Sequence, residues 1–272
     1  MAISIKSGGI QLRYFLLLIL IIVAIIPSER AISAEPLKAI TIVRGIGNYP
    51  PLEMVEKGEL TGLHIEMIRY VASQLNINVS FISLPWGRAL KDFSDGKFHA
   101  ISYFGYTKQR ERHSFYHRDN ILSNTRWVFL ALEERKNEFK FDRSLKGLED
   151  LVIGVQHGYS HGLYFDSMDH LIRDVVFTEF DLERMLKNKR HDLAMMSHQE
   201  FLGFKKRGDF KGIVALSPSI DMDPQYIAFS RKNNDEGAVE QLSEDFASAF
   251  KQFKESNAYQ DLLRSYRFQD YR

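Results

Sequence analysis

The chain has 272 residues, 44% of them hydrophobic and 26% charged, which is ordinary for a globular protein and enough for one large domain or two small ones. The 36 Lys and Arg residues nearly balance the 35 Asp and Glu residues, so with a formal net charge of +1 we expect no nucleic-acid partner. Cysteine is absent, which excludes disulfides, thiolate catalysis and cysteine-ligated metals.

The N-terminal segment has the features of a secretory signal peptide. Lys6 and Arg13 precede an unbroken apolar run over 14–26, and a small-residue stretch that ends at Ala34 follows. An uncleaved anchor is the alternative, but the run is shorter than the roughly 20 residues that span a bilayer. We therefore predict that 1–34 is removed and, with no cysteine for a lipid anchor, that the mature protein is free in the compartment to which it is exported. Cleavage removes three basic residues and one acidic residue, which leaves a net charge of −1.

Runs of β-branched residues alternate with segments of helical period, which predicts βαβ units and a mostly parallel sheet. The first α/β unit is predicted to contain strands at 39–43, 79–82 and 100–103 and helices at 65–75 and 86–93. Its first helix is indicated by apolar residues three and four positions apart, as on a buried helix face.

A second unit of the same kind follows an extended segment at 127–132. Its predicted strands lie at 152–155, 175–177, 193–196 and 213–216, and its predicted helices lie near 145–151, from Ser160 onward, and at 182–188. A return strand at 226–230 and two helices, at 239–253 and 258–266, complete the chain.

Two α/β units joined by two extended crossings predict a cleft between two lobes. We place lobe 1 at 35–126 plus 227–272 and lobe 2 at 127–226, with hinges in the segments 127–132 and 223–230. Ligand sites favour such clefts between domains. The organisation of the chain therefore predicts a small-molecule site between the lobes.

Several segments, in order along the chain, match the pattern of one family. They are Asn48–Leu52, Gly58–Gly62, Leu84–Trp86, Asp95–Phe98, Thr107–Arg110, Leu145–Gly147 and Ile153–Gln156. No single segment is specific, but in this order and spacing they make the chain resemble the family 3 extracellular solute-binding proteins, the amino-acid-binding class of ABC importers. The segment Pro85–Arg88 resembles a divergent branch of that family.

This resemblance implies a fold, a ligand class and a partner. The implied fold is a two-lobed α/β clamp with two hinge crossings (type II), in agreement with the periodicity. The implied ligand is a small carboxylate such as an amino acid, and the implied partner is an ABC permease in the inner membrane. We expect a monomer with no cofactor and no catalytic site. A binding protein that reports to a membrane receptor as a sensor is the alternative.

Arg110 is the residue that the resemblance places against the ligand's carboxylate. A guanidinium suits this role because its planar fork matches two carboxylate oxygens and stays charged at every working pH. Without the resemblance, Arg110 would be interpreted as a solvated cation in a basic loop with Lys108 and Arg112. Thr107 belongs to the same matching segment and is also expected at the ligand.

Four further residues are expected at the ligand. In lobe 2, Tyr159 and Ser160 follow a predicted strand, and Ser160 would cap the next helix, whose free N–H groups would face an anion. A plain helix cap is the structural alternative. Tyr49 and Trp86 match positions where the family packs residues against the ligand's side chain, although a single aromatic residue more often belongs to the core.

The chain departs from the family where an ammonium group would be recognised. Amino-acid binders place an aspartate five residues after the position of Asp192, and this chain has Ser197 there. The segment 100–106 is also shorter than usual, with Tyr103 and Phe104 where hydroxyl residues are common. Ser197 is therefore a candidate ligand contact, and carboxylate binding is better supported than α-amino binding.

One motif favours an enzyme. The segment 158–162 spells G-x-S-x-G between a strand and a predicted helix, the context of a hydrolase nucleophile, and Asp192 and His198 follow in the order of a triad. No oxyanion segment precedes the motif, and Asp192 lies too close to His198 for the two to come from separate loops. A serine hydrolase with Ser160 as nucleophile is thus the minor alternative.

Two histidine pairs have the spacing of metal ligands on a helix. His113 and His117 lie four residues apart, as do His157 and His161. Neither pair has a glutamate beside its first histidine, and His113 lies in a predicted loop. We therefore expect no metal site.

Overall fold

The computed structural model describes residues 37–220 and 222–268. The predicted signal peptide and its cleavage site at Ala34 lie outside the described residues. No helix in the described part of the chain has the length and apolar character needed to cross a membrane.

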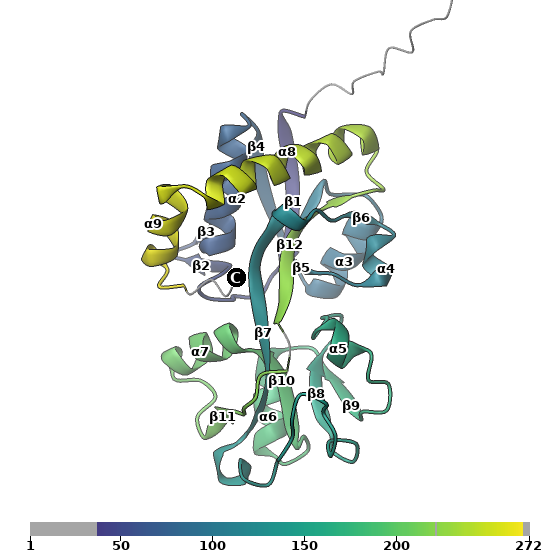
Figure 1. Cartoon of the computed structure of the whole chain (residues 1–272), viewed down its shortest axis with the longest axis vertical. Coiled ribbons are helices and arrows are strands. Elements are labelled where there is room, and N and C mark those ends of the chain that lie inside the picture. The colour runs from purple at the N-terminus through teal and green to yellow at the C-terminus, as the bar shows by residue number, and fades with distance from the viewer. Residues whose placement is uncertain (1–36, 221, 269–272) are drawn as a thin grey trace, which may run out of the picture. The chain divides into compact units, whose positions relative to one another are not determined.

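Lobe 1 is built from the N-terminal and C-terminal parts of the described chain (Figure 1). Its elements are β1 (Ala39–Gly45), β2 (Met54–Glu56), β3 (Glu59–Thr61), α2 (Leu63–Gln74), β4 (Asn78–Leu84), α3 (Trp86–Ser94), β5 (Ala100–Gly105), α4 (Lys108–Glu111), β6 (Ser114–Phe115), η1 (Arg118–Asn120), β12 (Met222–Ser230), α8 (Glu236–Lys254) and α9 (Asn257–Ser265). The strand β7 (Ile121–Leu132) leads from lobe 1 into lobe 2.

Lobe 2 is built from the middle of the chain. Its further elements are η2 (Glu133–Arg135), β8 (Ile153–Gln156), α5 (Leu163–Asp166), β9 (Arg173–Val176), α6 (Glu179–Lys187), β10 (Leu193–Ser197), α7 (His198–Arg207) and β11 (Ile213–Ala215). The strand order across both lobes is β4-β1-β5-β12-β7-β10-β8-β9, with β6 beside β12 and β11 beside β7.

Both faces of the sheet are covered in each lobe. In β1, Ile40 and Ile42 pack into the core that α2, α8 and α9 cover, whereas Val43 points to the opposite side and packs with α3. In β10, Leu193 and Met195 face the core that includes α5, and the alternate residues Ala194 and Met196 face α6 and α7. Strands buried on both faces are typical of α/β proteins, which explains their nearly continuous apolar sequences.

The two lobes are joined through neighbouring strands. The first half of β7 pairs with β12 up to the partners Arg126 and Met222, and from Trp127 onward β7 pairs with β10 instead. The first crossing therefore falls at Arg126–Trp127, at the start of the predicted hinge 127–132. The second falls between Ala215 and Met222, just before the predicted hinge that begins at Asp223.

The sequence predicted most of the core elements correctly. Each predicted strand and the predicted helices 65–75, 86–93, 182–188, 239–253 and 258–266 coincide with elements of the structure, within a few residues at their ends. Strands β4, β1 and β5 of lobe 1 are parallel to one another, as are β10, β8 and β9 of lobe 2, but β12 and β7 pair antiparallel with each of their neighbours. The mostly parallel sheet is thus a mixed one, because the two crossing strands run against their neighbours.

Two helix predictions were wrong. The segment 145–151 contains turns, because Leu145 and Gly147 adopt left-handed backbone conformations with φ of 57° and 87°. The second helix begins at Leu163 and not at Ser160. Neither α7 nor the β2–β3 hairpin was predicted from the sequence.

Candidate functional site

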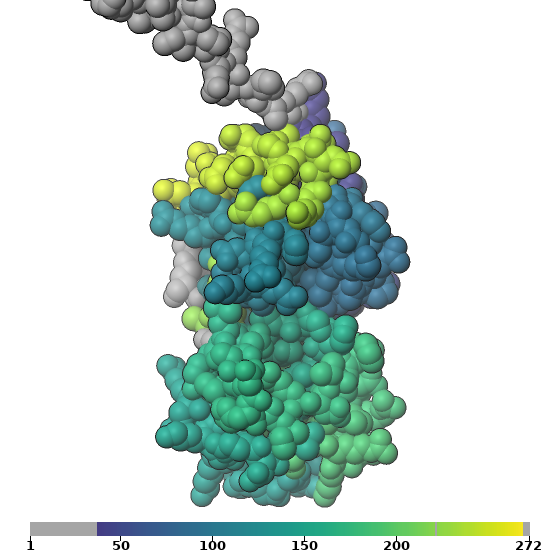
Figure 2. All heavy atoms as spheres, turned by 90° about the vertical axis from the view of Figure 1, so that its right-hand side faces the viewer, coloured from purple at the N-terminus to yellow at the C-terminus, as the bar shows by residue number. Residues whose placement is uncertain are grey.

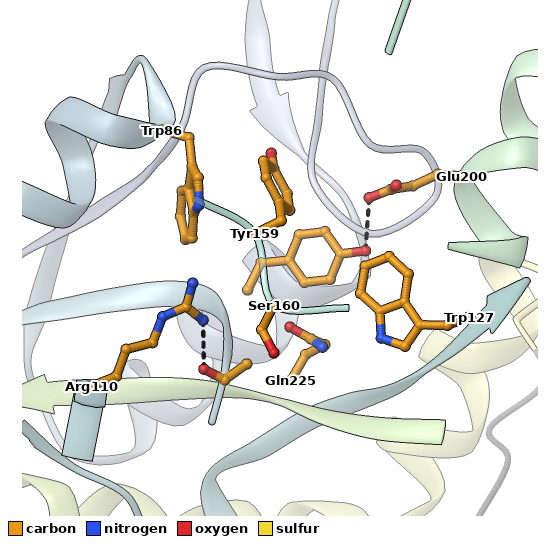
Figure 3. Close-up of a pocket in the computed structure, with 9 residues that line it drawn as sticks. Trp86, Arg110, Trp127, Tyr159, Ser160, Glu200 and Gln225 are labelled. Atoms are coloured by element: carbon orange, nitrogen blue, oxygen red, sulfur yellow. Dashed lines mark hydrogen bonds between the residues drawn. The ribbon is translucent and has the colours of Figure 1, made fainter. Parts of the chain in front are cut away.

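Nine residues from the two lobes enclose a small cavity between them (Figure 3). They are Trp86, Tyr103, Gly105, Arg110 and Gln225 from lobe 1 and Trp127, Tyr159, Ser160 and Glu200 from lobe 2. The cavity measures about 20 Å³, which is room for little more than one water molecule. In the space-filling view the atoms of the lobes meet across the cleft on the face shown (Figure 2). A solute can therefore enter only if the lobes part or side chains move.

A larger pocket adjoins this cavity. It measures about 510 Å³ and shares Arg110, Tyr159 and Ser160 with the cavity. Thr107 and Asp166 also line it. Arg110 therefore faces both spaces, and a solute larger than the small cavity has room to extend past it.

Arg110 is half-buried, and carbonyl groups from both lobes hold its guanidinium. The backbone N–H of Arg110 donates to Thr107 Oγ1 at 3.1 Å, which caps the short helix α4. Nη1 donates to the carbonyl of Gly105 at 2.7 Å and Nη2 to that of Gly158 at 2.8 Å. The guanidinium lies 4.5 Å from the centre of the Phe104 ring. Burial lowers the pKa of Arg110 and the nearby charge of Asp166 opposes this shift, although no carboxylate in the described residues is close enough to form an ion pair with the guanidinium.

The carbonyl of Gly158 is a meeting point of the lobes. It accepts a second hydrogen bond from Trp86 Nε1 at 2.8 Å. Gly158 has a φ of 75°, and an added Cβ would lie 3.2 Å from Leu90 and 3.3 Å from Trp86. A side chain here would strain the backbone and crowd lobe 1, so glycine allows the carbonyl to approach. The Trp86 ring also packs against Tyr159, with ring centres 5.3 Å apart.

Tyr49 connects the lobes beside the cavity. Its hydroxyl lies 2.5 Å from that of Tyr159, and its ring meets Tyr103 edge-on at 5.7 Å. Burial raises the pKa of Tyr49 and of Tyr159, so both remain protonated and able to share this hydrogen bond. Tyr49 is not among the residues that line the cavity. It holds Tyr159, which does line it.

A buried ion pair fixes the loop that carries Tyr49. Arg44 Nε donates to Glu53 Oε2 at 2.8 Å, and both side chains are 1% exposed. Arg44 Nη2 donates to the carbonyl of Gly47 at 2.7 Å, where an added Cβ would lie 2.0 Å from the Tyr49 hydroxyl. Burial alone would raise the pKa of Glu53, but the His64 ring, whose Nδ1 lies 3.6 Å from Glu53 Oε1, and the charge of Arg44 lower it overall. The carboxylate is therefore ionised, and the loop is held rigidly.

Ser160 lines both spaces, but it does not cap a helix. Gly162 is the N-cap of α5. Ser160 Oγ donates to Asp166 Oδ2 at 2.7 Å, and the backbone N–H of His161 donates to the same carboxylate at 3.2 Å. These bonds fold the segment before α5 into a loop, which explains why the predicted helix start was wrong. The N–H of His161 is already paired and does not face an anion as expected.

Thr107 and Ser197 both act as helix caps. Thr107 caps α4, as described, and lines only the larger pocket. Ser197 is fully buried and caps α7 by accepting the backbone N–H of Glu200 at 3.5 Å. The structure does not bring Ser197 to the cavity wall.

Glu200 is a buried carboxyl group in the cavity wall that the sequence analysis did not identify. It is 3% exposed and accepts a hydrogen bond from the Tyr103 hydroxyl at 2.8 Å. Burial, followed by the negative charge of Glu179, raises the pKa of Glu200 to about 8. Its neutral form therefore predominates at pH 7. The pattern Ser197-x-x-Glu200 matches a capping box, so the sequence pattern predicts only a structural role.

A β-bulge directs Tyr103 toward Glu200. Between the pairs Ile101–Ala228 and Phe104–Tyr226, β5 has one more residue than β12. Tyr103 lies in this interval with a φ of 52°, a left-handed conformation that is unfavourable for a bulky residue. Bulges next to functional sites commonly re-aim a side chain. Such a feature depends on strand pairing and has no local sequence signal.

Trp127 and Gln225 also line the cavity and were not predicted as site residues. Both belong to the crossing strands, Trp127 to β7 and Gln225 to β12. Trp127 was predicted to lie in a hinge. Any parting of the lobes about these strands would therefore move two walls of the cavity.

The structure does not assemble a hydrolase triad from the predicted residues. Ser160 donates to Asp166, and Asp192 accepts hydrogen bonds from Arg135 and from the backbone N–H of Val152. Within 37–220 and 222–268, no three His, Asp or Glu side chains gather as metal ligands. His161 packs against Trp127, and its burial lowers its pKa to about 3.

Residues 42–270 match the family model of the bacterial extracellular solute-binding proteins, family 3. Among curated proteins, the chain is similar to the arginine-binding periplasmic protein of Mannheimia haemolytica. The two are 26% identical over 223 residues, which are 79% of this chain and 86% of that protein.

Solved structures show the same fold at low sequence identity. A mutant of ArgBP from T. maritima superposes with a TM-score of 0.66 at 16% identity, covering 84% of this chain and 95% of that one. A histidine kinase sensor domain with similarity to periplasmic binding proteins gives a TM-score of 0.69 at 14% identity, covering 85% and 96%. With the family model matched over nearly all of the described residues, the chain belongs to the bacterial extracellular solute-binding proteins of family 3.

Proposed function

We propose that this protein captures a small carboxylate solute of the amino-acid class between its lobes and delivers it to an ABC permease, without acting on it chemically. The observation that carries the proposal is Arg110. Its guanidinium faces the cleft, is held only by carbonyl groups and has no carboxylate partner in the described part of the chain. Asp166 lies close enough to act on Arg110 but forms no ion pair with it, so an anionic ligand can still supply a direct charged partner for the guanidinium.

The cleft is suited to closing around such a solute. The lobes are joined by β7 and the start of β12, so a change in a few backbone angles near Arg126 and before Met222 would part them. Three side chains of lobe 1 donate to or share hydrogen bonds with lobe 2, namely Tyr49, Trp86 and Arg110. We expect these contacts to form when the lobes close. The name of the Mannheimia relative, an arginine-binding protein, supports an amino acid as the solute class.

A binding screen tests this function. The mature protein would be titrated by calorimetry with the twenty L-amino acids, with L-arginine first, and with small dicarboxylates. We expect binding of at least one carboxylate, with a rise in thermal stability of about 2.7 kcal/mol at 100 times its dissociation constant. The absence of binding by any carboxylate would overturn the proposal.

The site residues predicted from the family extend the proposal. We assign Arg110, Trp86, Tyr159 and Ser160 to the ligand-facing wall because all four line the small cavity. Tyr49 and Thr107 would act through Tyr159 and Arg110, which they hold.

A sensor is the second candidate. The same fold occurs in a histidine kinase sensor domain, which shows that such a clamp can serve signalling. Stimulation of a reconstituted permease ATPase by the loaded protein would favour transport. Activation of a receptor kinase without such stimulation would favour sensing.

Export is part of the same proposal. We propose that the segment 1–34 directs secretion and is removed after Ala34, which leaves a periplasmic monomer. Intact-mass measurement of the exported protein should give a chain that starts at Glu35. A mass that still includes Met1 would contradict it, and light scattering at working concentration would test the monomer.

A further inference from the structure

The cavity has a cation on one wall and a carboxyl group on another. Arg110 and Glu200 both line it, and they lie on opposite sides of the group of residues drawn in Figure 3. Neither side chain forms an ion pair within the described residues. Arg110 is held by carbonyl groups, and Glu200 by the hydroxyl of Tyr103.

We propose that Glu200 binds a protonated amino group of the captured solute, so that the cleft recognises a zwitterion with its carboxylate at Arg110 and its ammonium at Glu200. This rests on the proposed capture of a carboxylate solute. It assigns the ammonium contact to a residue in the first turn of α7 and not to the helix cap Ser197.

Burial is the first argument for a cationic ligand at Glu200. The side chain is 3% exposed and has one hydrogen-bond donor, Tyr103 Oη at 2.8 Å. A buried carboxylate is unfavourable unless it is paired and hydrogen-bonded. A protonated amine supplies both the positive charge and N–H donors, and it would therefore stabilise the ionised form that the closed cleft disfavours.

The aromatic walls are the second argument. Four rings line the cavity together with Glu200, and they belong to Trp86, Tyr103, Trp127 and Tyr159. Faces of such rings attract a cation, and tryptophan does so most strongly. A carboxylate anion placed among these rings near Glu200 would gain nothing comparable, so this end of the cavity suits an ammonium.

The charged groups around Glu200 fix the orientation of the ligand. Tyr103 from β5 donates to it, and Glu179 at the start of α6 adds negative charge nearby. Tyr159 and Tyr49 remain protonated because their pKa values are raised. Arg110 on α4 is the cation of the cavity wall and would repel an ammonium close to it. The ammonium therefore belongs at Glu200 and the carboxylate at Arg110.

Ser197 cannot make this contact in the observed arrangement. Its hydroxyl is fully buried, accepts the backbone N–H of Glu200 and does not line the cavity. A neutral hydroxyl also provides no charge for an ammonium. Glu200 compensates for the missing aspartate from a position three residues further along the chain.

A matched pair of solute panels tests the inference on the wild-type protein. One panel holds L-amino acids, and the other holds the corresponding 2-hydroxy acids, which keep the carboxylate and side chain but replace the ammonium with a hydroxyl. By calorimetry we expect an amino acid to bind at least about tenfold more tightly than its hydroxy acid, because a hydrogen-bonded charge pair is lost. Equal binding of both members of a pair would overturn the inference and leave carboxylate capture intact. Absence of binding in both panels would overturn the proposed function and the inference with it.

The variant Glu200→Gln tests whether Glu200 itself makes the contact with the ammonium group. Glutamine keeps the shape of the neutral acid but cannot ionise, so the preference for the amino acid should fall from at least about tenfold to within about threefold. Glu240→Gln, on an exposed part of α8, is the matched control and should keep the full preference. A preference unchanged in Glu200→Gln would overturn the assignment. If this variant does not fold, Glu200→Asp, which keeps the charge, provides the second test, and it should weaken the preference without abolishing it.

Discussion

Arg110 Nη2 donates to the carbonyl of Gly158 at 2.8 Å, directly across the cleft. Trp86 Nε1 donates to the same oxygen at 2.8 Å. One backbone carbonyl of lobe 2 therefore satisfies two side chains of lobe 1 where the larger pocket begins. A carboxylate that takes the place of this carbonyl would give Arg110 a charged acceptor, which forms shorter and stronger hydrogen bonds than a neutral one.

Replacement of Arg110 should weaken solute binding. Arg110→Ala should reduce the affinity for the confirmed solute at least about tenfold, because a charge-assisted hydrogen bond contributes about 1.5 to 3 kcal/mol. Arg110→Lys should recover only part of this loss, since lysine keeps the charge but lacks the planar fork. Calorimetry on correctly folded variants provides the measurement. Arg112→Ala, an exposed arginine two residues away, serves as the control. Wild-type affinity in Arg110→Ala would remove Arg110 from the site.

Loss of the hydroxyl of Tyr49 should favour parted lobes. Tyr49→Phe removes the bond to Tyr159 and leaves the ring contact with Tyr103 in place. A hydrogen bond contributes about 0.5 to 1.5 kcal/mol net, so the closed population should fall about two- to tenfold relative to the open one. Small-angle scattering, or distance measurement between labels on the two lobes, would report this shift. Tyr70→Phe, at a half-exposed position stacked on Phe253, should leave the equilibrium unchanged.

Disruption of the buried ion pair beneath the Tyr49 loop should destabilise the protein strongly. Glu53→Gln leaves the guanidinium of Arg44 buried without a counter-charge, and we expect a loss of about 3 to 5 kcal/mol in the free energy of unfolding. Denaturant titration would measure it. The exposed pair Glu66–Arg69 offers the comparison, since Glu66→Gln should cost at most about 1 kcal/mol. A similar small effect for both variants would show that the buried pair does not support the fold.

The same carboxylate predicts how stability responds to acid. The pKa of Glu53 is lowered in the folded protein, so its contribution is fully present above its ordinary pKa of 4.5 and is lost as the pH falls below that value.

Glu200 should have the opposite effect on stability. Its pKa is raised from 4.5 to about 8, so between these values the folded protein binds more protons than the unfolded chain. The unfolding free energy should therefore decrease as the pH rises through this window and level off above about pH 8. Thermal unfolding of wild type and Glu200→Gln from pH 5 to 9 measures the effect. The variant should gain stability relative to wild type as the pH rises, and parallel profiles would contradict the prediction.

Binding of an ammonium should release this proton. A cation beside Glu200 favours the ionised carboxylate, so calorimetry at pH 7 in buffers of different ionisation enthalpy should detect proton release in wild type and none in Glu200→Gln.

Periodicity predicted the α/β architecture because the strands and long helices depend on local apolar spacing. The strand at 39–43 and the helix at 65–75 are examples, and both occur within two residues of their predicted ends. The segment from Ser160 was misinterpreted because the carboxylate of Asp166 draws Ser160 and His161 into a loop. That competition between a side chain and a helix start is not visible in the spacing of apolar residues.

The candidate site was only partly predictable for the same reason. Arg110 and Trp86 lie in segments that match the family, so sequence comparison located them. Glu200 lies in a pattern typical of an ordinary helix cap, and Tyr103 reaches it through a bulge that exists only once β5 and β12 have paired. Residues whose role arises from long-range pairing have no signal of their own in a single sequence.

The pairing of Arg126 with Met222 across β7 and β12 means that the chain leaves lobe 1 and returns to it at neighbouring positions. Lobe 2 is thus an insertion into a chain that otherwise folds back on itself, and a two-residue hairpin turn suffices to join antiparallel neighbours of this kind. The strand order β4, β1, β5 and β12 of lobe 1 is therefore formed entirely by chain outside the inserted lobe. For the same reason, a fluorescent domain grafted between these two positions would have both of its ends attached to the strands that cross between the lobes.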